Sequence, residues 1–92
     1  MEELKSALAE YISVLETSAA NTHRAEDRGR YQQHLADAAL MYAALEKHQS
    51  VEKLKELVAS ERHGFGWDYL DPEGKAAEAA FSAFAKLVER AT

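Results

Sequence analysis

The sequence predicts an all-α protein, a compact up-and-down bundle of four helices. Apolar residues recur at three- and four-residue spacing along the chain, which is the period of an amphipathic helix. The chain's one proline, Pro72, permits long helices elsewhere. Short connections and the lack of a strand pattern favour a bundle over a mixed fold. We expect one helical domain over residues 1–92.

The first helix is predicted over residues 2–20. Its apolar residues form one stripe, and polar residues cover the opposite side. Glu2 and Glu3 suit the positive N-terminal end of the helix dipole. The stripe consists of Leu4, Leu8, Tyr11, Ile12, Leu15 and Ala19.

The second helix is predicted over residues 23–49, with an inward seam spaced alternately by four and three residues. Gly29 falls inside this pattern, where it costs about 1 kcal/mol relative to alanine. The seam consists of Tyr31, Leu35, Ala38, Tyr42 and Leu45.

The second helix is also apolar on a second side. Leu40 lies nearly opposite the seam at 100° per residue, and alanines surround it. A helix that is apolar on two sides is either central in its fold or shared with another subunit. Leu40, Met41 and Ala44 are therefore the candidate residues for self-association as a dimer.

Two further helices are predicted, over residues 51–62 and 72–91. The third has a narrow apolar face, and Gly64 ends it. The fourth has a strong N-terminal signal, because Asp71 can cap it and Pro72 suits the first helical position. Its apolar stripe consists of Ala77, Ala80, Phe81, Phe84, Leu87, Val88 and Ala91.

An aromatic, glycine-containing loop precedes the last helix. Three of the chain's eight aromatic residues (one Trp, four Tyr and three Phe) lie within residues 65–69. In one alternative Phe65, Trp67 and Leu70 fold back as a lid on the core, and in the other Trp67 and Tyr69 stand exposed as anchors rimmed by Glu61 and other acids. The two can coexist, with Trp67 and Leu70 inward and Tyr69 outward. The candidate interaction residues are Phe65, Trp67, Asp68, Tyr69 and Asp71.

Composition narrows the classes of function. The net charge of −5 disfavours nucleic acid and membrane surfaces as partners. The absence of cysteine fits a reducing cytoplasm, where we expect this protein to lie. The N-terminus does not read as a signal peptide, and no stretch is apolar enough to span a membrane.

No pattern predicts catalysis, a metal or a cofactor. The chain lacks the Glu-x-x-His pairs of carboxylate-bridged metal bundles and a Gly-x-Ser-x-Gly turn. His34 and His48 lie about 21 Å apart along one helix, too far to share an ion. We expect them to be half-exposed at the edge of the seam. The prediction is a protein that is not an enzyme.

The segment Tyr69-Leu70-Asp71-Pro72, in a small acidic four-helix protein, resembles the nuclease-colicin immunity proteins. This resemblance implies an acidic surface with tyrosines that blocks a basic nuclease. The family's paired-tyrosine-proline motif is absent here, and the third helix is longer.

The sequence thus favours a non-catalytic protein-interaction or adaptor domain that self-associates, with any other protein partner unidentified. The alternative is an acidic, immunity- or antitoxin-like inhibitor of a basic protein. These hypotheses differ in salt dependence, because binding driven by charge is screened by ions.

Overall fold

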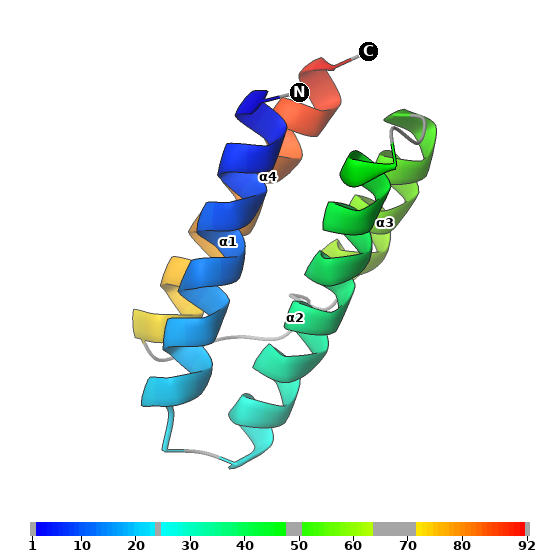
Figure 1. The fold of residues 1–92 in the computed structure, drawn as a ribbon. Helices are drawn as coiled ribbons and strands as arrows, with labels where there is room; N and C mark the ends of the chain where they lie inside the picture. The colour runs from blue at the N-terminus through cyan, green and yellow to red at the C-terminus, as the bar shows by residue number, and fades with distance from the viewer. Residues whose placement is uncertain (1, 24, 48–50, 64–71, 92) are drawn as a thin grey trace.

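A computed structural model describes residues 2–23, 25–47, 51–63 and 72–91, and in these ranges it confirms an all-α bundle of four helices (Figure 1). The helices are α1 (Glu2–Asn21), α2 (Ala25–Glu46), α3 (Val51–His63) and α4 (Pro72–Arg90). The bounds of α1, α3 and α4 lie within one residue of the prediction, whereas α2 is shorter at both ends.

The corner between α1 and α2 explains why α2 begins after His23. The backbone N–H of Thr22 donates to the carbonyl of Ser18 at 3.0 Å, so the chain is still completing α1 there. The guanidinium of Arg28 then donates to the carbonyl of Thr22 at 3.0 Å. This contact satisfies a carbonyl that the end of α1 leaves without an intrahelical donor.

Each helix packs against its neighbours along the chain, and α4 closes the ring by packing on α1. Figure 1 shows α1 beside α4 on one side of the bundle and α2 beside α3 on the other. The first turn of α1 and the last turn of α4 lie at the same end of the bundle (Figure 1). Between the described parts of the diagonal pairs, α1 with α3 and α2 with α4, there is no close backbone approach.

The core runs through the centre of this ring. The inward stripe of α1 is confirmed at Leu4, Leu8, Tyr11 and Leu15. The stripe of α4 is confirmed at four positions, while Ala80 and Leu87 are half-buried and Ala91 is exposed. The largest apolar side chains that are fully buried are Tyr11, Tyr31, Phe84, Leu8, Leu15, Met41, Leu45 and Leu54.

The seam of α2 differs from its prediction at two positions. His34 and Met41 face the core, whereas Leu35 is half-buried and Tyr42 is 37% exposed. The prediction of a half-exposed His34 is therefore wrong, because this side chain is only 3% exposed. The cause is a contact in the core with the carboxyl group of Glu61 from α3. Glu61 is itself only 1% exposed, so it does not form part of an acidic rim around the aromatic loop.

Candidate functional site: the outer face of α2

The predicted interaction residues of the aromatic loop lie outside the described residues. These are Phe65, Trp67, Asp68, Tyr69 and Asp71. The choice between a core lid and an exposed recognition loop therefore stays a prediction. The geometry that can be described belongs to the four helices.

The three candidates for self-association occupy different environments. Leu40 is 58% exposed, the highest value among the large hydrophobic side chains of the described residues. Met41 is fully buried and Ala44 is 3% exposed, so both belong to the core. Met41 lies three residues after Ala38 on the inward face, and Ala44 lies at the edge that packs on α3. Of the three, Leu40 is the residue that a second protein could contact directly.

Leu40 lies at the edge of a small groove between α2 and α3, here called the α2–α3 groove. The groove encloses about 220 Å³, below the roughly 300–1,000 Å³ of typical small-molecule sites. This size suits side chains of another protein better than a cofactor. Its lining residues are Leu40, Ala43, Ala44 and Lys47 from α2, and Lys53 and Leu57 from α3.

The outer face of α2 around Leu40 carries few charges. Ala36 and Ala39 are exposed and Ala43 is half-buried, so small apolar side chains surround the leucine. Asp37 lies three residues before Leu40 and accepts a hydrogen bond from Gln33 at 3.3 Å. Lys47 lies seven residues after Leu40 and is exposed. The face is thus apolar in the middle, acidic toward its N-terminal end and basic toward its C-terminal end.

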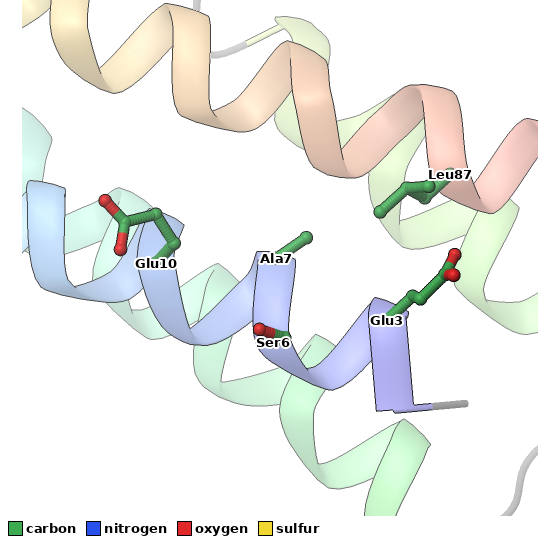
Figure 2. Close-up of a pocket in the computed structure, with 5 residues that line it drawn as sticks. All are labelled: Glu3, Ser6, Ala7, Glu10 and Leu87. Carbon is green, nitrogen blue, oxygen red and sulfur yellow. The ribbon is translucent and has the colours of Figure 1, made fainter.

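A second hollow lies on the opposite side of the bundle, between α1 and α4. Figure 2 shows Ala7 and Leu87 approaching each other from these two helices, with Glu10 and Glu3 on either side. Ser6 completes the lining. This α1–α4 hollow is shallow and open, and its charged side chains are acidic, in contrast with the lysines of the α2–α3 groove.

A buried polar network joins three helices inside the core. The hydroxyl of Tyr11 donates to Oε2 of Glu61 at 2.9 Å. Nδ1 of His34 lies 2.6 Å from Oε1 of the same carboxylate. Which of these two atoms donates depends on the tautomer of the imidazole. The bond between Tyr11 and Glu61 spans the α1–α3 diagonal, where the backbones do not meet.

Tyrosine, glutamate and histidine are side chains that act in acid–base catalysis, but this network is enclosed. Tyr11, His34 and Glu61 are each at most 3% exposed, and none lines the groove or the hollow. A general base must come within hydrogen-bond reach of its substrate. The arrangement therefore supports a structural role, in which one carboxylate fixes α1, α2 and α3 relative to one another.

The sequence contains a signal for this network that was not used. Glu61 follows Leu54 and Val58 at helical spacing, and His34 lies between Tyr31 and Ala38 on the buried side of α2. A polar residue at a core position of each of two adjacent helices indicates a buried pair, because an unpaired buried charge is costly. The apolar spacing of α2 and of α3 continues without a break only if His34 and Glu61 are counted as core residues.

The described residues offer neither a cluster of metal ligands nor a membrane-spanning helix. No group of three or more His, Asp and Glu side chains in these ranges could hold a metal ion. No helix among them is long and apolar enough to cross a membrane. Comparison of the chain with protein-family models, with curated proteins and with solved structures finds no match.

Proposed function

We propose that this protein is a non-catalytic interaction domain that associates with itself through the outer face of α2. The observation that carries the proposal is the 58% exposure of Leu40 at the centre of a charge-poor helical face. Covering a fully exposed leucine side chain contributes about 1.5–3 kcal/mol, and covering the exposed part of Leu40 contributes a corresponding fraction of this, so this residue offers an anchor for association.

Two features support a binding role over a catalytic one. The acid–base side chains of the core are sealed from solvent, which leaves no described position where they could meet a substrate. The α2–α3 groove is small and is lined by aliphatic side chains and lysine stems. Apolar centres with polar edges are typical of protein–protein contacts.

Sedimentation equilibrium tests the proposal. The wild-type protein at high micromolar concentration should sediment with twice the 10.2 kDa mass of the chain. Leu40→Glu should sediment as a monomer, because it places a charge at the centre of the contact. Ala79→Glu, on the exposed face of α4, is the matched control and should behave as wild type. A wild-type protein that stays monomeric would contradict the proposal.

A second candidate function is an acidic inhibitor of a basic protein. The net charge of −5 and the acid-lined α1–α4 hollow favour it. Affinity capture from a native lysate, with Glu10→Lys as the matched bait, provides the test. This candidate predicts a basic partner that is lost with the variant and elutes steeply with salt. A partner held equally by both baits at high salt would count against it.

A further inference from the structure

We infer that two copies of this chain pair through antiparallel α2 helices, with Leu40 of each copy on the two-fold axis. The inference rests on the proposed self-association and adds its geometry. In a two-fold dimer the same patch contributes from both subunits, so the patch must complement itself. The outer face of α2 meets this requirement in both shape and charge.

The charges on this face match when the second helix is reversed. Asp37 lies about 4.5 Å along the axis on one side of Leu40, and Lys47 lies about 10.5 Å on the other side. An antiparallel partner centred on Leu40 therefore brings its Lys47 to within about 6 Å, along the axis, of Asp37. The flexible four-carbon stem of lysine can span such an offset. The two-fold axis makes this pair twice.

A parallel pairing would not match these charges. It would align Asp37 with Asp37 and Lys47 with Lys47, and like charges across a contact disfavour association. The groove lysines, Lys47 and Lys53, would then lie at the same end of both copies and add to this repulsion. Reversal of the second helix is thus the orientation that the sequence of this face supports.

The small residues beside Leu40 allow a close approach. Ala36 and Ala43 lie on the outer face, one turn before and about one turn after Leu40. Packed helices lie about 8–10 Å apart, depending on the side chains between them. With alanines on either side, Leu40 of each copy can reach the backbone surface of the other helix.

A different arrangement would place the α1–α4 hollow of one copy against the α2–α3 groove of another copy. Glu3 and Glu10 of the hollow complement Lys47 and Lys53, but the hollow lies on the opposite side of the bundle. A head-to-tail contact of this kind leaves one unfilled surface at each end, so it builds an open chain, or a ring where the rotation closes, instead of stopping at a two-fold pair. Oligomer size therefore separates the two arrangements.

Disulfide trapping tests the position of the axis. The chain contains no cysteine, so Leu40→Cys introduces one thiol per copy. Two thiols beside a two-fold axis can reach the Cβ separation of about 3.5–4.5 Å that a disulfide needs. Under mild oxidation, the Leu40→Cys protein should cross-link at least about tenfold faster than the Ala79→Cys protein. The reason is that the dimer raises the effective concentration of the two thiols at position 40.

A charge exchange tests the orientation. Asp37→Lys and Lys47→Asp should each weaken dimerisation about two- to fivefold, as expected for partly exposed ion pairs. The double variant should recover the wild-type dissociation constant, because it restores both pairs with their charges reversed. Circular dichroism on each variant checks that the helices are retained.

The outcomes separate the inference from the function on which it rests. A Leu40→Cys protein that still sediments as a dimer but fails to cross-link, or a charge-exchange double variant that does not recover, would overturn the antiparallel pairing and leave self-association standing. Rings of more than two copies or open polymers, if Glu10→Lys disperses them, would overturn it in favour of the head-to-tail contact. A monomeric wild-type protein would overturn both.

Discussion

Nδ1 of His34 lies 2.6 Å from Oε1 of Glu61, although the two residues are 27 positions apart in the chain and both are buried. Tyr11 contacts the other oxygen of the same carboxylate. In the described residues no buried side-chain nitrogen or oxygen lacks a hydrogen-bond partner, so this network is complete. A complete network fixes the relative position of its helices, whereas removal of one member takes a buried hydrogen-bond partner from the others.

Removal of the shared carboxylate should be strongly destabilising. We expect Glu61→Leu to lower the free energy of unfolding by about 3–5 kcal/mol, because it removes the buried carboxylate that Tyr11 and His34 both contact. Glu56→Leu, on the exposed side of the same helix, should change it by less than about 0.5 kcal/mol. Urea denaturation measures both. Equal effects of the two substitutions would contradict a role for Glu61 in the core.

The hydroxyl of Tyr11 can be tested by itself. Tyr11→Phe keeps the ring, which lies 5.6 Å from the ring of Phe81, and removes one hydrogen bond to Glu61. We expect a loss of about 1.5–3 kcal/mol, the range for hydrogen bonds to charged groups. Tyr42→Phe, at a partly exposed position, is the control and should be close to neutral. Thermal denaturation of the two variants side by side provides the comparison. A Tyr11→Phe protein as stable as the wild type would show that this hydrogen bond does not stabilise the fold.

Gly29 should be replaceable with a gain in stability. It lies inside α2, and a Cβ added there meets no atom within 4 Å. Because alanine loses less backbone entropy than glycine in a helix, Gly29→Ala should raise the free energy of unfolding by about 0.5–1 kcal/mol. A higher midpoint in a thermal melt is the expected result. A lower midpoint would show that the glycine serves a role beyond the described packing.

Two leucines of α2 should separate folding from association. Leu45 is fully buried, and Leu45→Ala should cost about 2–5 kcal/mol of stability at any protein concentration. Leu40→Ala should leave the unfolding of dilute protein nearly unchanged, and it should reduce only the concentration dependence of the melting temperature. A concentration-independent loss of several kcal/mol for Leu40→Ala would place this residue in the core.

The helices were predictable because their signals are local. Apolar periodicity defined α1, and Asp71-Pro72 marked the start of α4 within one residue. The errors arose where a tertiary contact decides the environment. His34 and Glu61 are polar residues at core positions of their own helices, and only the packing of α3 against α2 makes them mutual partners.

One residue of the candidate surface, Leu40, was predictable from the local pattern of its helix, whereas Met41 was not. The exposure of Leu40 follows from its position opposite the inward seam, which the sequence shows directly. Met41 was grouped with it by composition, but a shift of the true seam from Tyr42 to Met41 turns this side chain inward. That shift depends on the burial of His34, which the sequence of α2 alone does not indicate.

The central claim, association through the outer face of α2, is tested most directly by a dilution series followed with residue-resolved NMR. Our account predicts concentration-dependent shifts for the methyl groups of Leu40, Ala36 and Ala43, and none for Ala7 or Leu87 in the α1–α4 hollow. Spectra that do not change from the low to the high micromolar range would contradict self-association. Shifts confined to Ala7 and Leu87 would place the contact on the opposite side of the bundle.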